Sequence, residues 1–420
     1  MHFISQRWPA DVYLATGARA VSACGDFLAA TALVLALQQR GYGGIAVAAV
    51  LVAAAAPPVL LVRWTGRLVD RGDSRVLLVG TGLAQAGVCV ALAFASGVAE
   101  IIALVVVLAA GLAVTGPSLA ALLPTMVRAD DLPRVTALGQ TANAVGIMIA
   151  PALGGVLTGQ FGLRVPLLAD AASYLAIAGA GRLIRTRRGR RRAPAARAAA
   201  IPDGSWRLRE DALLRPAFVL VGAVLAAVSL VNVAEVFFIR QDLHSTAAVF
   251  GLLSATWIGA TIVGGQLLGR RRPSDAGLGV TLLGALALAC VAVAVMAAAP
   301  DAGWLVPMNI AGGLGNGGLN VATGVLLGRR VPAAARGRAF AVYGAVINAA
   351  SMTGYLIGGL LLAVVPVRAC IATAGLFGLG MTAAFALPVL RAAGRDRHRA
   401  HDQAGMGGVD RPRQRLADSG

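Results

Sequence analysis

Residues 66–75 read Gly66-Arg-Leu-Val-Asp70-Arg71-Gly-Asp-Ser-Arg75, a short charged segment between two long apolar stretches. A bilayer core of about 30 Å is crossed by about 20 helical residues, and the flanking stretches, 45–68 and 76–97, both reach that length. A tight turn between them places Asp70 where it can interact with the positive N-terminal end of another helix. The segment predicts a membrane-embedded helical hairpin, and its simplest alternative role is a charged turn that only fixes topology.

The composition of the whole chain also predicts a membrane protein. Of its 420 residues, 58% are hydrophobic and 13% are charged, about half the charged share of a typical soluble domain. Glycine and proline inside apolar stretches are tolerated in membrane helices, where close packing favours small residues. We expect an all-α polytopic protein with about twelve spans, at 13–37, 45–68, 76–97, 101–123, 135–158, 163–184, 216–239, 247–269, 276–299, 303–327, 338–363 and 367–390.

The arginines predict the orientation of these spans. All 37 basic residues are arginine, and with the N-terminus inside, only Arg40, Arg164, Arg240 and Arg368 fall in outer loops. Because cytoplasmic loops are enriched in arginine, we expect a multi-pass protein of the inner (cytoplasmic) membrane with both termini in the cytoplasm. The same rule explains the net charge of +18 without a nucleic-acid partner. We expect a monomer whose macromolecular environment is the lipid bilayer.

The spans divide into two sets of six. We expect an N-terminal half (1–184), a basic cytoplasmic linker (185–215), a C-terminal half (216–390) and a disordered cytoplasmic tail (391–420). Residues 205–214 of the linker fit either a short amphipathic helix on the membrane surface or a disordered tether.

An internal repeat relates the two halves. Gly154-Gly155 recurs as Gly358-Gly359 at a shift of 204 residues, and the segment that begins at Gly66 recurs at Gly265 at a shift of 199. Parallel six-helix repeats form a central binding site between them.

Several polar residues lie inside the predicted spans. Asp26 falls near the middle of the first span, where an ionised carboxyl costs free energy unless it is paired or hydrated. It is therefore a candidate for binding a proton and the substrate in alternation, and its alternative is a structural acid held by hydrogen bonds to a neighbouring helix. The seventh span carries Asn232 and Glu235, and the tenth carries Asn316 and Asn320, four residues apart on one face. Glu235 could instead lie near the headgroups, and the asparagines could join neighbouring helices.

Cysteines and histidines show no pattern of a metal or redox site. The four cysteines are isolated within apolar stretches, and the four histidines include no helical pair. Paired aspartate-rich clusters and catalytic pairs of membrane enzymes are also missing from the sequence. We therefore expect neither an enzyme nor a bound cofactor.

The charged segment and the fifth span carry a resemblance to a known family. Gly66-x-Leu-x-Asp70-Arg71-x-x-x-Arg75 is similar to the signature loop of the major facilitator superfamily. Gly146-Ile-Met-Ile-Ala-Pro151-Ala-Leu-Gly154-Gly155 resembles the helix-five motif of its drug and metabolite exporters, which usually has glycine where Ala150 stands. Ser22-Ala-Cys-Gly-Asp26 and Arg336-Gly-Arg338 resemble the branch with siderophore exporters and macrolide-efflux proteins.

The resemblance has implications for function. It implies that Asp70 and Arg71 belong to a cytoplasmic gate, and that the region of Pro151, Gly154 and Gly155 shapes helix packing that limits leak. It also implies that helices one, four, seven and ten line the cavity, which would hold Asp26, Asn232, Glu235, Asn316 and Asn320. We expect a secondary transporter that exports a small amphiphilic molecule by proton antiport with alternating access, driven by the proton gradient. Import, lipid flipping and membrane sensing are alternatives on the same scaffold.

Overall fold

The chain folds as a bundle of helices. The computed structural model describes residues 9–128, 131–184, 211–270, 275–332 and 335–406, except the side chains at 63, 70–71, 120–121, 123–124, 133, 275–276 and 393–406. In those ranges all regular secondary structure is helical: α1 (Ala10–Gln39), α2 (Gly44–Leu60), α3 (Val62–Arg71), α4 (Ser74–Phe94), α5 (Val98–Met126), α6 (Leu132–Phe161), α7 (Arg164–Leu183), α8 (Leu214–Phe237), the π-helical turn η2 (Phe238–Asp242), α9 (Ala247–Gly269), α10 (Asp275–Met296), α11 (Leu305–Arg330), α12 (Arg336–Leu361) and α13 (Val367–Met406).

The predicted spans correspond to these helices. Ten of the described helices are long and apolar enough to cross a membrane. Two further helices complete the predicted set of about twelve: α2, which is apolar but has 17 residues, and α7, which has 20 residues and includes Arg164, Asp170 and Arg182. The predicted all-α polytopic fold is confirmed.

The second predicted span is interrupted. Instead of one helix over 45–68, the structure has α2 and α3, with a turn at Leu61 between them, where φ is −90° and ψ is −1°. Pro57 and Pro58 lie in the last turn of α2. Because proline has no N–H to donate, two helical hydrogen bonds are lost just before the break.

The last helix is longer than predicted. The disordered tail was expected from residue 391, yet α13 continues to Met406. The added segment is rich in alanine and arginine, which favour helix, so polarity alone was a poor guide to its conformation.

Residues 407–420 of the tail and residues 185–210 of the linker lie outside the part of the chain that the structure describes. At the end of the linker, the carboxylate of Asp211 forms an ion pair with Arg330 at 3.2 Å and accepts the backbone N–H of Leu213 and Leu214.

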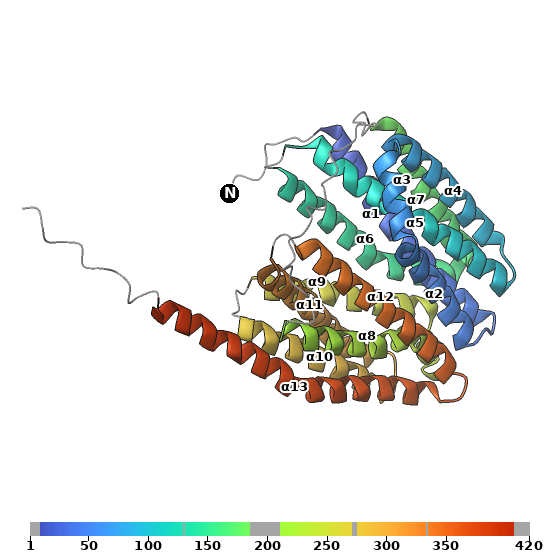
Figure 1. Cartoon of the computed structure of the whole chain (residues 1–420). Helices are drawn as coiled ribbons and strands as arrows, with labels where there is room; N and C mark the ends of the chain where they lie inside the picture. The colour runs from blue at the N-terminus through green and yellow to red at the C-terminus, as the bar shows by residue number, and fades with distance from the viewer. Residues whose placement is uncertain (1–8, 129–130, 185–210, 271–274, 333–334, 407–420) are drawn as a thin grey trace, which may run out of the picture.

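Two halves with matching helix contacts make up the bundle (Figure 1). In the N-terminal half α1 packs on α6 and α7, and α4 packs on α5 and α7. In the C-terminal half α8 packs on α12 and α13, and α10 packs on α11 and α13. The halves meet through α6 with α9 and through α2 with α12.

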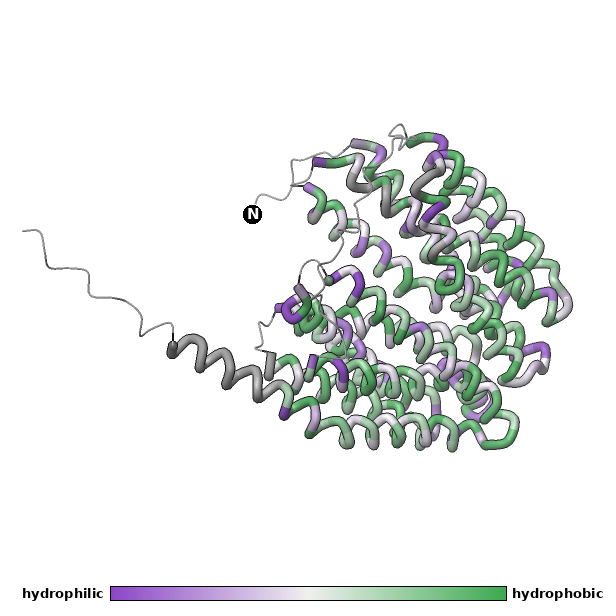
Figure 2. Tube along the Cα trace, viewed as in Figure 1, coloured by the Kyte–Doolittle hydropathy of each residue, from purple (hydrophilic) through white to green (hydrophobic). Residues whose placement is uncertain are grey.

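The outer surface of the bundle is apolar (Figure 2). Large hydrophobic side chains such as Leu175, Leu376 and Phe377 are more than half exposed. An apolar surface of this extent on a water-soluble protein would mark a binding face, and on a bundle of spanning helices it faces lipid.

Glycines hold the two halves together at one end. A Cβ atom on Gly155 of α6 would lie 3.0 Å from the Cα of Gly251 on α9, and one on Gly359 of α12 would lie 2.7 Å from the Cβ of Ala48 on α2. Non-bonded carbons pack at about 3.5–4.0 Å, so no larger residue fits these backbone contacts as they stand.

The neighbouring glycines pack within each half. A Cβ on Gly154 would lie 2.9 Å from the carbonyl oxygen of Leu28 on α1, and one on Gly358 would lie 3.0 Å from that of Leu230 on α8. The same α1 surface contacts Gly146, whose Cβ would lie 2.7 Å from the carbonyl oxygen of Ala20. In both repeats, therefore, the first glycine of the pair contacts its own half and the second contacts the other half.

The halves separate toward the opposite end. One apolar core joins both halves near the glycine contacts, whereas a second core, around Leu214, Leu282 and Leu326, lies in the C-terminal half alone. In α12 no residue between Phe340 and Ala349 is buried. The separated end is the end at which α1 begins and α13 finishes (Figure 1).

The glycine contacts can be tested with a matched pair of substitutions on α12. Gly359→Leu should loosen the contact between α2 and α12 at the closed end, because its side chain would overlap Ala48 and the backbone of Gly44. Gly344→Leu is the control, since nothing lies within 4 Å of the Cβ it would add. Hydrogen–deuterium exchange of the first turns of α2 should be faster in Gly359→Leu only. Equal exchange in the two variants would mean that this contact does not hold the end closed.

Candidate functional site

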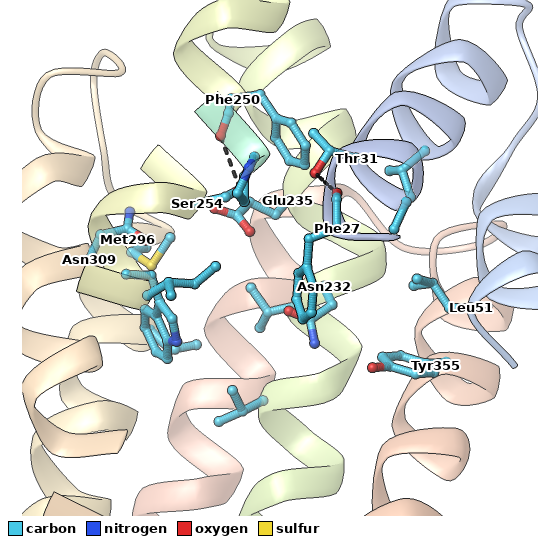
Figure 3. A pocket seen from close by; sticks show the side chains of 18 residues that line it. Phe27, Thr31, Leu51, Asn232, Glu235, Phe250, Ser254, Met296, Asn309 and Tyr355 are labelled. Atoms are coloured by element: carbon cyan, nitrogen blue, oxygen red, sulfur yellow. Dashed lines mark hydrogen bonds between the residues drawn. The ribbon is translucent and has the colours of Figure 1, made fainter. Parts of the chain in front are cut away.

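A cavity of about 320 Å³ lies between the two halves, beside the glycine contacts (Figure 3). Its volume is within the range of small-molecule sites, about 300–1,000 Å³. The N-terminal half contributes mostly apolar side chains, from Phe27, Ala30, Thr31, Val34, Leu51 and Pro151. The C-terminal half contributes most of the aromatic and polar side chains together with further apolar ones, from Val228, Val231, Asn232, Glu235, Phe250, Ser254, Trp257, Ile258, Val293, Met296, Asn309 and Tyr355.

One face of α8 presents two of the predicted residues to this cavity. Val228, Val231, Asn232 and Glu235 all line it, and their spacing places them on one side of a helix. Tyr355 of α12 lines the same cavity as Asn232. Figure 3 shows the Asn232 and Glu235 side chains projecting from α8 between the helices of both halves.

The other polar side chains of the cavity are bonded to their own helices. The Ser254 hydroxyl donates to the carbonyl of Phe250 at 3.0 Å, and the Thr31 hydroxyl donates to that of Phe27 at 2.8 Å. The Asn309 amide donates to the carbonyl of Leu305 at 3.0 Å. Each of these three side chains thus donates a hydrogen bond to its own helix and not to Glu235.

Glu235 is the one charged side chain among the lining residues. It is half-buried and forms no hydrogen bond or ion pair with any residue that the structure describes. A charged group in such a setting is costly unless a partner or water compensates it. The cavity therefore contains one acidic group that is available to a ligand.

Asp26 lies in a second, smaller cavity inside the N-terminal half. This cavity, of about 180 Å³, is lined by Arg19, Ser22 and Asp26 of α1 together with α5 residues and Ile177 of α7. The expectation that Asp26 shares the central cavity is not met. Successive residues of an α-helix point about 100° apart, so Phe27 faces the other half while Asp26 faces the interior of its own half.

A hydrogen-bonded cluster surrounds Asp26. The Tyr174 hydroxyl donates to Oδ1 of Asp26 at 2.5 Å. One turn before Tyr174 on α7, Asp170 is fully buried. Its carboxyl group accepts from the Ser173 hydroxyl at 3.0 Å and from the Cys89 thiol at 3.3 Å. Two carboxyl groups thus lie in one polar cluster between α1, α4 and α7.

Gly25 allows α1 to approach this cluster. A Cβ atom at Gly25 would lie 2.6 Å from the Ser173 hydroxyl oxygen and 3.0 Å from its Cβ. The contact brings the backbone of α1 directly against α7. It thereby sets the distance between Asp26 and Tyr174.

Neither of the two predicted asparagines of α11 lines either cavity. The Asn316 amide donates to the Thr261 hydroxyl at 3.4 Å, which joins α11 to α9. This bond matches the alternative role of an interhelical contact. Asn320 is exposed and lines neither cavity.

A family model described as Major Facilitator Superfamily matches residues 15–294 and, in a second match, residues 217–415. The chain belongs to this superfamily. The two overlapping matches agree with the repeated halves, because each begins at the start of a six-helix unit.

Solved structures of other transporters share the fold. The nucleoside transporter NupG has a TM-score of 0.73 at 13% identity, over 91% of this chain and 99% of that one. The peptide transporter POT, in complex with alafosfalin, has a TM-score of 0.72 at 14% identity, over 94% and 96%. A bacterial homologue of the iron transporter ferroportin, in an inward-facing state, has a TM-score of 0.69 at 15% identity, over 92% and 100%. In a comparison by sequence, no curated protein matched the chain significantly.

The superfamily's signature loop lies at the separated end of the bundle. Gly66 is in α3, and Arg75 is in the first turn of α4, where its backbone N–H donates to the carboxylate of the capping residue Asp73 at 2.8 Å. The side chains of Asp70 and Arg71 lie outside the described part of the chain. Their role in a gate stays a prediction.

Asp170 and Tyr174 were missed by the sequence analysis. Asp170 had a visible signal, since it is an acid within an otherwise apolar stretch, as Asp26 is. Tyr174 had none, because a tyrosine in a membrane helix is common and its partner lies 148 residues away.

The contact at Gly25 predicts a loss of stability. Gly25→Ala should lower the stability of the folded chain by roughly 1–3 kcal/mol, the usual cost of overpacking, because the new methyl group would overlap Ser173 and Asp170. Thermal unfolding in detergent, followed by intrinsic fluorescence, would measure the change. Gly17→Ala on the same helix is the control, because nothing lies within 4 Å of its added Cβ. If both variants unfold like the parent, α1 and α7 are not in the close contact described.

Proposed function

We propose that the chain is a secondary transporter that exports a small amphiphilic organic molecule by proton antiport. The observation that carries the proposal is the central cavity, which adjoins a closed end of the bundle while the halves separate at the opposite end. A site between two repeats that can close on one side at a time is the basis of alternating access.

The arginine distribution supports the direction of opening. If the arginine-rich loops are cytoplasmic, as the positive-inside rule predicts, the separated end faces the cytoplasm. The fold's similarity to a ferroportin homologue in an inward-facing state agrees with this orientation. In this conformation the substrate would enter the cavity from the cytoplasm, as export requires.

The polar cluster around Asp26 is the proposed proton site. Its carboxyl group is half-buried in the smaller cavity that Arg19 also lines, and its one described hydrogen bond comes from the neutral Tyr174 hydroxyl. Since an ionised carboxyl at this depth is costly, a proton bound or released there changes the free energy of the local helix arrangement. Asp170 lies in the same cluster, and its carboxyl group is a second site at which that proton could bind.

Helix α1 supplies a physical link between the proton site and the cavity. Asp26 lies on its inner face, while Phe27 and Thr31 line the cavity on its other face. A shift of α1 caused by protonation would therefore move part of the cavity wall. This arrangement couples two sites that do not share a space.

The proposal can be tested in everted membrane vesicles with a respiration-driven pH gradient. A panel of amphiphilic antibiotics, dyes and siderophores is added, and we expect at least one compound to dissipate the gradient with the parent chain. Asp26→Asn should abolish the effect, because the substituted residue cannot release a proton. Tyr174→Phe should weaken it, because the hydrogen bond to Asp26 is removed.

Glu100→Gln serves as the control, because Glu100 is exposed at the start of α5 and its side chain accepts only the Ser96 N–H in the described structure. It should behave like the parent chain. Substrate movement that survives Asp26→Asn with the gradient unaffected would contradict proton antiport through Asp26. Movement of headgroup-labelled lipid in place of the panel compounds would identify a flippase instead.

A further inference from the structure

The central cavity is chemically asymmetric. Its N-terminal wall is apolar apart from Thr31, whose hydroxyl is bonded to the carbonyl of Phe27. Its C-terminal wall holds Glu235, the one charged lining residue, beside Asn232. A ligand that fits both walls has one polar end and one apolar end, with the polar end toward α8.

The charge of Glu235 selects the sign of that polar end. No described residue forms an ion pair or a hydrogen bond with its carboxyl group. An anionic ligand would place two like charges together in a weakly hydrated space, whereas a cation would supply the missing partner. A single carboxylate balances a single positive charge.

Aromatic side chains surround the space beside Glu235. Phe27, Phe250, Trp257 and Tyr355 all line the cavity. Faces of aromatic rings attract cations within about 6 Å, and tryptophan attracts them most strongly. The lining therefore suits a cation that carries apolar or aromatic groups.

The position of Trp257 depends on the glycine-rich segment of α11. A Cβ atom on Gly312 would lie 2.7 Å from Cη2 and 3.1 Å from Cε3 of the Trp257 ring, and one on Gly313 would lie 2.7 Å from the Cβ of Ala260. The indole is thus seated in a notch that exists because α11 lacks side chains there. This gives Gly312 a role in the cavity that spacing alone did not reveal.

We infer that the cavity binds a singly charged organic cation with an apolar or aromatic body, with Glu235 as its counter-charge and Trp257 as an aromatic wall. The inference rests on the proposed function only in taking this cavity as the substrate site. A metal ion suits the site poorly, because hard divalent cations need several oxygen ligands and the described residues contain no group of three His, Cys, Asp or Glu side chains that could hold one.

Direct binding to the full-length chain in lipid nanodiscs tests the inference. Calorimetric titrations with three probes of similar shape and different charge are compared: tetraphenylphosphonium, neutral triphenylphosphine oxide and anionic tetraphenylborate, each corrected with empty nanodiscs. We expect saturable binding of the cation alone. Because this comparison uses the unsubstituted chain, it does not depend on whether any variant folds.

Variants then assign the binding to the two residues. Glu235→Gln should weaken tetraphenylphosphonium binding at least tenfold, and Asp301→Asn, in the exposed loop before α11, should leave it unchanged. Gly312→Ala should weaken it several-fold by displacing the indole of Trp257. Gly324→Ala on the same helix is its control, because nothing lies within 4 Å of the added Cβ.

The outcomes separate this inference from the proposed function. Equal binding of all three probes, undiminished cation binding in Glu235→Gln, or competition by Mn²⁺ would overturn the cation assignment. Glu100→Gln should retain tetraphenylphosphonium binding, because Glu100 is exposed at the start of α5 and does not line the central cavity. Binding that depends on Glu235 without any effect on the pH gradient would leave the ligand class standing and overturn proton antiport. A gradient collapsed only by uncharged compounds would overturn the cation assignment and leave proton antiport standing.

Discussion

Backbone contact between glycines is the constraint on which the arrangement of this protein depends. Gly155 against Gly251, and Gly359 against Gly44 and Ala48, leave no room for a Cβ atom between the two halves. Helices in lipid gain little from apolar burial against each other, so close van der Waals packing at small residues supplies much of their association. Here that packing is concentrated at one end, and the central cavity lies next to it.

The internal repeat explains why this closure has two equivalent parts. Each half supplies one helix with a glycine pair, α6 or α12, whose first glycine contacts its own half and whose second contacts the other. A substitution that separates α6 from α9 therefore leaves the α2–α12 contact to hold the end. Opening requires both contacts to part, which favours movement of the halves as rigid units over bending of a single helix.

The sequence predicted the helices well, because the apolar length of a span depends on the bilayer and not on detailed packing. It singled out Glu235 and Asn232 as polar groups in an apolar helix, and the family resemblance implied that they line a cavity, which both side chains do in the structure. The sequence could not predict which side of α1 faces the central cavity. That helix is apolar on most sides, so periodicity does not distinguish the side of Asp26 from the side of Phe27. It missed the Tyr174 partner for a related reason, because the contact is created by the fold at Gly25 and leaves no local pattern.

The division of chemistry between the halves has a physical advantage. The carboxyl cluster of Asp26 and Asp170 lies within the N-terminal half, and Glu235, which no described residue pairs with, lies at the wall of the C-terminal half. If one carboxyl bound both proton and substrate, the two would compete directly, and changes in substrate chemistry would alter proton affinity. With the proposed separate sites, coupling would pass through α1, which contributes to both cavities. The cavity wall could then vary with the ligand while the proposed proton site stays the same, so ligand class and energy coupling could change independently.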